Sequence, residues 1–283
     1  MSRAEQITDP CAQHGEGPVW HGGWPGLRWV DLLAGDVLTL RRDGSVDRVH
    51  VGSVVAALRP RRGGGAVLAL ERGFALADDS LTSLRPLGEL WTDTSVRMND
   101  GGCDPQGRFY CGSMAYDEAP GRGRLYRLDH NRRATAVLSG LTISNGLAWS
   151  PDGTTAYFVD TPTQCVDAFA YAAGELAQRR HIARIDPELG SPDGLTVDAE
   201  GCIWVALWGG GAVHRYSPEG TLLDIITLPV PRVTACTFGG PSCTDLYITT
   251  SRQAVDLTTH PDSGALFIAR NAGKGLPAAA FDG

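Results

Sequence analysis

A strand–turn–strand unit recurs along this chain at a nearly constant interval, and this repeat limits the possible fold more than any other feature. Each clear copy has a short apolar run, a tight turn closed by glycine, and a second run rich in aromatic and β-branched residues. The turn glycines are Gly107, Gly153 and Gly201, which are 46 and 48 residues apart. Glycine suits such a turn because it adopts positive φ without steric cost.

Weaker copies extend the series in both directions. Turns are expected near Gly65, near Thr244 and between Gly22 and Gly26. Six units of about 46 residues then account for nearly the whole chain. A period of roughly 40–50 residues with several strands per unit is typical of β-propellers. The sequence therefore predicts an all-β protein, a single six-bladed β-propeller domain over residues 1–283.

Other architectures fit the sequence less well. A two-sheet sandwich would not need so regular a repeat, and a doubly wound α/β fold needs amphipathic helices between its strands. We find no convincing run of apolar residues at helical spacing. The best candidate, residues 171–184, begins Tyr-Ala-Ala-Gly and is better interpreted as a β-hairpin.

Charge and composition argue against several classes of partner. The 283 residues carry a formal net charge of −7, and the one dense basic group is Arg59-Pro-Arg-Arg. An acidic chain with a single short basic loop is not expected to bind nucleic acid. No segment approaches the ~18 consecutive apolar residues of a membrane helix, and residues 1–13 lack the regions of a signal peptide. The seven cysteines are dispersed and form no Cys-x-x-Cys pair, so we expect a reduced, cytoplasmic protein without a thiolate zinc site.

Polar residues occupy equivalent positions in four of the units. Asn99, Asn145 and Asp193 each stand eight residues before a turn glycine, and Glu16 leads the matching strand of the first unit. The first residues of an innermost propeller strand are expected to face the central pore. A ring of blades would therefore point all four side chains at one place. The alternative is that they only cap turns at strand starts, but their recurrence at one position favours a shared site.

Two carboxylates and two amides make a hard, all-oxygen ligand set. Such a set suits Ca²⁺, Mg²⁺ or Mn²⁺, and it can also hold Zn²⁺ or Fe²⁺. Glycine follows Glu16, Asn145 and Asp193, which predicts a close approach of the backbone to an ion or ligand. The sequence thus predicts one divalent metal cation in the central pore.

Several motifs of this chain match one known family. They are Glu16-Gly-Pro-Val-Trp, Arg97-Met-Asn-Asp-Gly, Ser144-Asn-Gly-Leu-Ala-Trp-Ser-Pro-Asp-Gly, Ser191-Pro-Asp-Gly-Leu, and the closing Gly275-Leu-Pro-Ala with Phe281-Asp-Gly. Over almost its whole length the chain resembles the SMP-30/gluconolactonase/regucalcin family. The resemblance implies a six-bladed propeller with one catalytic divalent cation, and many members open aldonolactones.

The resemblance also implies roles for individual residues. Glu16, Asn145 and Asp193 would be the metal ligands, and Arg97 and Asn99 would contact the substrate. Asp193 is in addition the candidate general base, because the metal would hold it beside water or substrate.

A further acidic substrate contact of the family falls at Asp117. This side chain is shorter than the glutamate of animal relatives, and Glu118 stands beside it. The identity of the substrate therefore stays open at this point.

The leading hypothesis is a metal-dependent hydrolase of a five- or six-membered sugar lactone in carbohydrate oxidation. A phosphoester or organophosphate hydrolase on the same scaffold and a non-catalytic calcium-binding propeller remain open, since the fold alone does not separate them. A closed propeller exposes few strand edges, so a monomer is expected.

Other motifs carry less weight. We interpret the seven histidines as surface or loop residues, although His14 could line the pore because it stands two residues before Glu16. The Gly209-Gly-Gly run is interpreted as a turn rather than a phosphate cradle, since no helix follows it. Trp149 and Trp208 follow pore-facing strands, and packing is their expected role.

Overall fold

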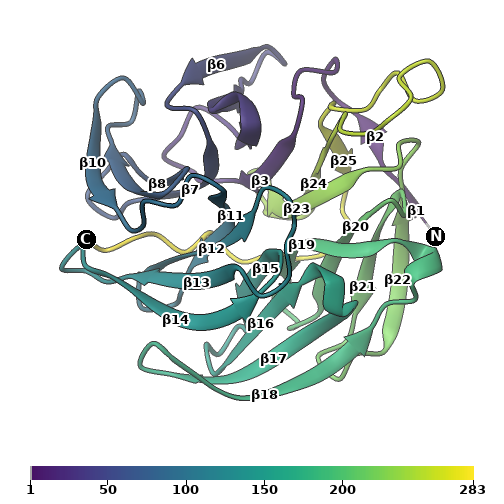
Figure 1. Ribbon diagram of the computed structural model, residues 1–283. Helices are drawn as coiled ribbons and strands as arrows, with labels where there is room; N and C mark the ends of the chain where they lie inside the picture. The colour runs from purple at the N-terminus through teal and green to yellow at the C-terminus, as the bar shows by residue number, and fades with distance from the viewer. Residues whose placement is uncertain (1) are drawn as a thin grey trace.

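The computed structural model describes residues 2–283 and shows six antiparallel sheets around a central axis (Figure 1). In blades 1 to 5 the first strand of the blade lies innermost and the next three step outward, whereas in blade 6 the N-terminus supplies the outermost strand. The innermost strands gather at the centre of Figure 1, and the outer strands lie at the rim. The prediction of an all-β, six-bladed propeller is confirmed.

The blades follow one another along the chain. Blade 1 contains β3 (Gly15–Val19), β4 (Arg28–Asp31), β5 (Asp36–Leu40) and β6 (Val46–His50). Blade 2 contains β7 (Val55–Pro60), β8 (Ala66–Leu70), β9 (Gly73–Ala77) and β10 (Leu84–Glu89). Blade 3 contains β11 (Val96–Cys103), β12 (Phe109–Ala115), β13 (Gly123–Leu128) and β14 (Ala134–Leu141). Blade 4 contains β15 (Ser144–Trp149), β16 (Thr155–Asp160), β17 (Cys165–Ala172) and β18 (Glu175–Arg184). Blade 5 contains β19 (Ser191–Val197), β20 (Ile203–Trp208), β21 (Ala212–Tyr216) and β22 (Leu222–Thr227). Three short 3₁₀ helices stand in loops, namely η1 (Leu32–Ala34), η2 (Thr161–Thr163) and η3 (Pro187–Leu189).

Blade 6 joins the two ends of the chain. Its inner strands are β23 (Val233–Gly239), β24 (Asp245–Thr250) and β25 (Phe267–Ala269), and its outer strand is the N-terminal β2 (Glu5–Gln6), which pairs antiparallel with β25. The preceding strand β1 (Ser2–Arg3) pairs parallel with β22 of blade 5. The N-terminal segment thus covers the open edges of two blades and closes the ring.

All six predicted inner hairpin turns are present. In the three clear copies the amide of the turn glycine donates to the carbonyl three residues earlier, at 3.0 Å for Gly107, 2.8 Å for Gly153 and 3.0 Å for Gly201. These glycines have φ of 84°, 69° and 85°, where a side chain would be strained. The weaker copies form equivalent bonds from Gly64, Cys243 and Trp24. Residues 171–184 form the β17–β18 hairpin, as predicted.

The core lies between the blades. Inner strands such as β11 and β12 are buried along their whole length, whereas the outer strands β10, β14 and β18 are mostly exposed. Aromatic pairs join neighbouring blades, for example Phe74 with Phe109 between blades 2 and 3, at a centroid distance of 5.5 Å. Among the described residues no helix is both long and apolar enough to cross a bilayer.

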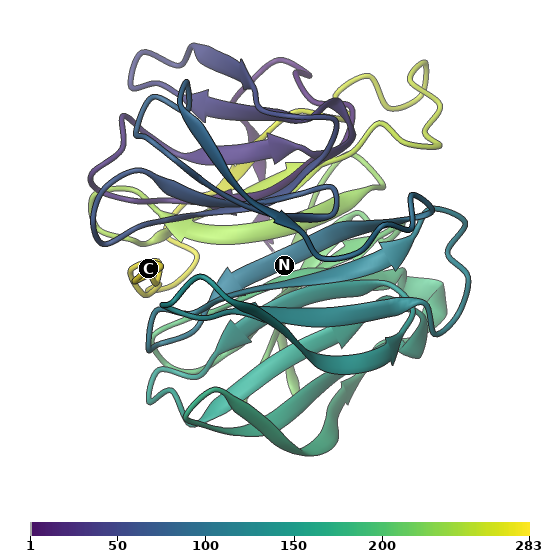
Figure 2. The ribbon, with the colours of Figure 1, turned by 60° about the vertical axis from the view of Figure 1, so that its left-hand side comes forward.

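The C-terminal segment, residues 270–283, crosses one end of the central channel; it lies on the left of the molecule in Figure 2. On its way it bonds to the inner hairpin turns of four blades. The amide of Gly275 donates to Cys243 O, Ala199 donates to Lys274 O, Phe281 donates to Pro60 O, and Asp282 donates to Gly107 O. The segment therefore ties blades 6, 5, 2 and 3 together.

Phe281 anchors this segment, because its side chain is fully buried in the cluster that contains Phe74, Met98 and Phe109. Phe281→Ala should lower the free energy of unfolding by about 3–5 kcal/mol, the cost of lost apolar burial plus a cavity, as measured by urea denaturation. Leu276→Ala in the same segment is the control, because Leu276 is exposed, and it should cost less than about 1 kcal/mol. Equal losses in the two variants would contradict the anchoring role.

Candidate functional site

A polar cavity of about 390 Å³ opens at one end of the central channel. Its wall contains five of the six residues predicted for the site, namely Glu16, Arg97, Asn99, Asn145 and Asp193. They come from the innermost strands of blades 1, 3, 4 and 5. Asp117 is not among the residues that line the cavity. The remaining wall consists of His14, Met114, Glu118, Ile143, Thr161, Pro162, Ser191, Trp208 and Gln253.

The four aligned polar residues share one structural feature. The strand register is interrupted between Glu16 and Val19 in β3, and at the level of Asn99, Asn145 and Asp193 in β11, β15 and β19. A β-bulge bends the strand and redirects a side chain out of the regular pleat. The same interruption occurs between Val55 and Ala57 in β7 and between Val233 and Ala235 in β23, so it is a feature of all six inner strands. In four of them it coincides with the polar residues that line the cavity.

The glycines that follow the polar residues serve the packing of the blades. A Cβ on Gly146 would lie 2.7 Å from Leu195 Cγ, and a Cβ on Gly194 would lie 2.5 Å from Ala235 Cβ. Gly17 has φ of 50°, which is unfavourable for other residues. The close approach that the sequence predicted is therefore between neighbouring inner strands. This close approach narrows the ring of inner strands at the level of the bulges.

A chain of hydrogen bonds orients the amides of the site. Arg97 Nη1 donates to Asn99 Oδ1 at 2.7 Å, and Asn99 Nδ2 donates to Asn145 Oδ1 at 3.2 Å. Asn145 Nδ2 donates to Thr161 Oγ1 at 2.9 Å, and the Thr161 hydroxyl itself donates to Pro192 O. Since the Thr161 proton is used, Thr161 accepts from Asn145 and fixes its amide. Asn145 Oδ1 keeps a second lone pair for a ligand.

Buried carboxyl groups are concentrated around this cavity. Burial raises the pKa of Glu16, and the neighbouring carboxylates of Asp193 and Asp100 raise it further. The pKa of Asp193 is likewise raised, first by burial and then by Asp100. Burial also raises the pKa of Asp100, which lies in β11 next to Asn99. Removing several carboxylates from water costs free energy unless a proton or a cation neutralises them.

This donor set fits a hard divalent cation. Glu16 and Asp193 supply carboxylate oxygens and Asn145 supplies an amide oxygen, the ligands that such cations prefer. A cation would also remove the mutual repulsion of the carboxylates. Glu16, Asn145 and Asp193 are therefore the residues placed to hold one.

A second acidic cluster, Asp198, Glu200 and Cys202, is a different case. Arg215 Nη2 donates to Asp198 at 2.9 Å and to Glu200 at 2.5 Å, and Trp204 Nε1 donates to Asp198 at 3.0 Å. The arginine already compensates these carboxylates. We assign this cluster to blade packing rather than to metal binding.

The acidic residue that reaches the cavity from the β12–β13 loop is Glu118. Asp117 is exposed, and its Oδ1 accepts a hydrogen bond from the amide of Ala119 at 3.2 Å. Glu118 has φ of 57°, and its amide donates to Ala115 O at 3.0 Å. Glu118 is itself exposed, and it lies at the mouth of the cavity as part of its wall. Positive φ is uncommon at glutamate and often marks a functional site, but it could not be inferred from the residue types.

His14 also lines the cavity. Its Nδ1 lies 2.9 Å from Ser251 Oγ, and its Nε2 lies 4.0 Å from Glu16 Oε1. Burial, with a smaller effect of Arg97, lowers the pKa of His14 to about 3, so the imidazole is neutral. His214 is buried too, with Nδ1 at 3.0 Å from Tyr216 OH. The interpretation of the histidines as surface or loop residues is therefore wrong for these two, because ring closure buries strand starts and inner positions alike.

The remaining motifs are accounted for by local structure. The amides of Gly209 and Gly211 donate to Pro231 O and that of Gly210 donates to Leu207 O, so the three-glycine run is a turn with no amide left for a phosphate.

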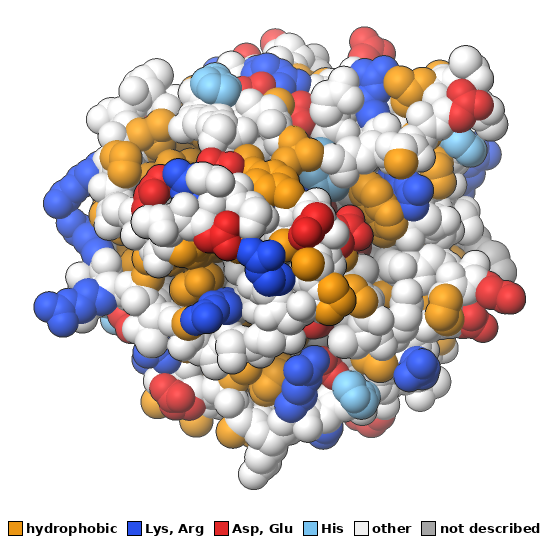
Figure 3. Space-filling view, in the orientation of Figure 1, with side chains coloured by type: hydrophobic (Ala, Val, Ile, Leu, Met, Phe, Trp, Pro, Cys, Tyr) orange, Lys and Arg blue, Asp and Glu red, His pale blue; other side chains and the backbone are white. Residues whose placement is uncertain are grey.

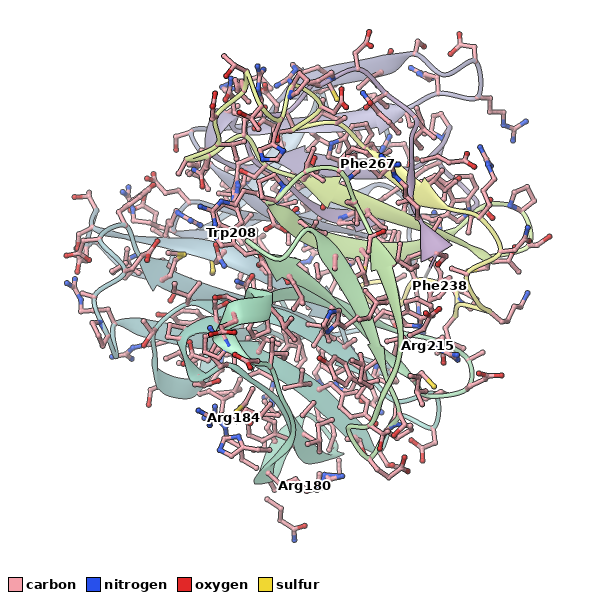
Figure 4. The ribbon with its side chains drawn as sticks, turned by 90° about the vertical axis from the view of Figure 1, so that its right-hand side faces the viewer. Arg180, Arg184, Trp208, Arg215, Phe238 and Phe267 are labelled. Carbon is pink, nitrogen blue, oxygen red and sulfur yellow. The ribbon has the colours of Figure 1, made fainter. Side chains whose placement is uncertain are left out.

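Trp149 lines a second cavity, of about 340 Å³, at the other end of the channel. Trp208 lines the polar cavity. Figure 4 shows Trp208 at one end of the propeller and Phe238, which lines the second cavity, at the other.

The face shown in Figure 3 carries acidic, basic and apolar side chains in mixture. Its lysine and arginine side chains are dispersed rather than gathered into one broad patch.

Comparisons with known proteins agree with this architecture. The family model described as the SMP-30/gluconolactonase/LRE-like region matches residues 14–252. Regucalcin of Danio rerio is 34% identical over 291 residues, which cover 99% of each chain. Pentonolactonase XacC of Haloferax volcanii is 35% identical over 285 residues, which cover 96% of each chain. The solved structure of the calcium-binding protein regucalcin from Agrobacterium tumefaciens has a TM-score of 0.90 and 27% identity, and covers 99% of this chain and 97% of its own. The chain belongs to the SMP-30/gluconolactonase family.

Proposed function

We propose that this protein is a divalent-metal-dependent hydrolase that opens a sugar lactone to its aldonic acid. The observation that carries the proposal is the convergence of Glu16, Asn145 and Asp193 with Arg97 and Asn99 on one cavity of about 390 Å³. A cavity of that size accepts a ligand as small as a monosaccharide lactone. The relative from Haloferax volcanii that is named pentonolactonase supports the same reaction class.

The metal would be held by Glu16, Asn145 and Asp193. When bound, a divalent cation supplies a Lewis acid that stabilises the negative charge developing on the carbonyl oxygen of an ester under attack.

Asp193 is the proposed general base, and its carboxylate would take the proton of the attacking water. Asp193 lies at the bulge of β19 on the wall of the cavity, where a bound substrate and an attacking water would lie next to it. Arg97 is proposed to bind sugar oxygens. Its Nη1 is engaged by Asn99 and Met98 O, but its Nε is buried without an acceptor among residues 2–283. Because Arg97 lines the cavity, its guanidinium is proposed to donate to oxygens of the bound ligand.

The charges of the cavity favour a neutral substrate over a phosphoester. Its wall carries three acidic side chains, Glu16, Glu118 and Asp193, and one arginine, Arg97. One divalent cation brings this set to neutrality and leaves no excess positive charge for a phosphate group. We therefore place the phosphoester hydrolase second, and the calcium-binding propeller without catalysis third.

The first prediction concerns the reaction itself. Proton release from gluconolactone, xylonolactone and arabinonolactone should exceed the spontaneous rate. It should vanish after EDTA treatment and return with one of Ca²⁺, Mn²⁺, Zn²⁺ or anaerobic Fe²⁺. Asp193→Ala should lower kcat at least about 100-fold, the usual contribution of a general base. Tight binding of an ion without hydrolysis of any lactone would favour the calcium-binding or phosphoester alternatives.

The second prediction follows from the raised pKa values of Glu16 and Asp193. In the metal-free protein the folded state holds these protons more tightly than the unfolded state, where Asp and Glu titrate near pH 4. The contribution of these two groups to stability is therefore fully present below about pH 4 and is lost as the pH rises through their folded-state pKa values. Metal displaces the protons, so the rise in Tm on adding metal should be larger at pH 8 than at pH 5.

Asp193→Asn tests the same electrostatics. It removes a buried charge, so at pH 8 in EDTA its Tm should exceed that of the parent by at least about 2 °C, and the gain in Tm on adding metal should be lost. Asp198→Asn is the matched control, because Asp198 is a buried carboxylate already paired with Arg215, and this variant should keep the metal-dependent gain. A pH-independent gain in the parent, or a full gain in Asp193→Asn, would contradict the assignment.

The third prediction separates the two neighbouring acids. Glu118→Gln should raise KM for a hydroxylated lactone about tenfold, through loss of a charge-assisted hydrogen bond to a sugar hydroxyl. KM for the unsubstituted δ-valerolactone should hardly change, since it has no hydroxyl. Asp117→Asn is the control and should leave both values unchanged. The reverse result, with the effect in Asp117→Asn, would restore Asp117 as the acidic contact.

A further inference from the structure

Trp208 is an aromatic ring on the wall of a cavity that is otherwise lined by polar and aliphatic side chains. Among the described residues, the only other aromatic side chain in that wall is the imidazole of His14. Trp208 is partly exposed, whereas Trp29 and Trp204 are fully buried between blades. A large apolar ring that remains open to a binding cavity is a candidate contact surface for a ligand.

The backbone of Trp208 is held on both sides. It pairs with Ser191 of β19 and with Arg232 at the start of blade 6. The following glycine turn makes this approach possible, because a Cβ on Gly210 would lie 2.1 Å from Leu189 O. The position of the indole is thus set by three blade segments rather than by a free loop.

The side chain of Trp208 is also supported. The Arg232 guanidinium lies over the indole with Cζ 4.7 Å from the ring centroid. The His14 ring contacts it edge-on, with centroids 5.8 Å apart and planes at 80°. His14 in turn lies 2.9 Å from Ser251 Oγ through Nδ1. These contacts cover part of the indole and limit its rotation, and Trp208 still lines the cavity.

The opposite side of the cavity is polar. Arg97, Asn99 and Glu118 belong to blade 3. Blade 3 lies across the channel from blade 6, which carries Gln253, and blade 5 beside it carries Trp208. A ligand in this cavity meets hydrogen-bonding groups on several sides, and on the side of blade 5 it also meets the indole of Trp208. Sugar rings have this character, because their hydroxyls project from a ring whose C–H bonds form apolar faces.

We propose that Trp208, supported by Arg232 and His14, is the surface on which the C–H face of a sugar lactone ring packs, and that it gives the site its preference for cyclic over open-chain polyhydroxy ligands. The inference rests on the proposed function, which supplies the ligand class. In this arrangement Trp208 is a specificity-determining residue that contributes to the binding of the ring and takes no part in proton transfer.

The test uses binding as well as turnover. The probe is the six-membered lactam of a pentonic acid, which keeps the ring and hydroxyls of the lactone but resists hydrolysis. Its Kd is measured by calorimetry on the full chain saturated with Mn²⁺, beside that of the open-chain pentitol xylitol. Trp208→Ala should weaken lactam binding about tenfold, the loss of one aromatic contact, and xylitol binding less than about threefold. Trp208→Phe should restore most of the lactam affinity.

Turnover gives the second readout. Trp208→Ala should raise KM for the lactone about as much as it raises the lactam Kd, with kcat within about threefold of the parent and unchanged Mn²⁺ affinity. Trp20→Ala is the matched control, because Trp20 is also partly exposed and stacks on an aromatic ring, Tyr247, but does not line the cavity. It should leave Kd and KM unchanged.

The outcomes separate the inference from the proposed function. Lactone hydrolysis by the parent with an unchanged lactam Kd in Trp208→Ala would overturn the role of Trp208 alone. Trp208-dependent lactam binding without hydrolysis of any lactone would uphold the ring contact and overturn the reaction. A parent that neither binds the lactam nor hydrolyses a lactone would overturn both.

Discussion

The pairing of β2 with β25 is the constraint on which the rest of the structure depends, since it turns a row of blades into a ring. Without closure, the inner strands of blades 6 and 1 would each lack a neighbour. With it, every inner strand is buried between two others, and the bulged positions of four of them meet around one axis. The site is therefore a consequence of closure and not of any single blade.

Close packing and concentrated charge occur together at this site. The glycines at 146 and 194 let neighbouring inner strands approach until no Cβ would fit between them. The close approach of the inner strands also buries the carboxyl groups of Glu16, Asp100 and Asp193. Burial raises the pKa of each of these groups. A closed β-ring with this charge arrangement is stabilised by whatever neutralises it. If the proposed cation binds there, the stability of the fold is connected to its binding.

The two walls of the cavity divide the work of recognition. Blade 3 presents Arg97 and Asn99 in a hydrogen-bonded row, and the loop after β12 adds Glu118. Blades 5, 6 and 1 present Trp208, Gln253 and His14. In the proposed function, the shape and polarity of a ligand would thus be selected by segments up to 239 residues apart, from His14 to Gln253.

The sequence by itself determined the six hairpins, the all-β class and the four aligned polar positions. These features are local: a tight turn needs glycine at positive φ, and Asn99, Asn145 and Asp193 each stand eight residues before that glycine. Only the tertiary structure decided that Glu118 and not Asp117 lines the cavity, because the two are neighbours of the same chemical type in one loop. It also decided that His14 meets Ser251 and that Trp208 meets Arg232. Those contacts join residues distant in sequence, and only the closure of the ring brings them together.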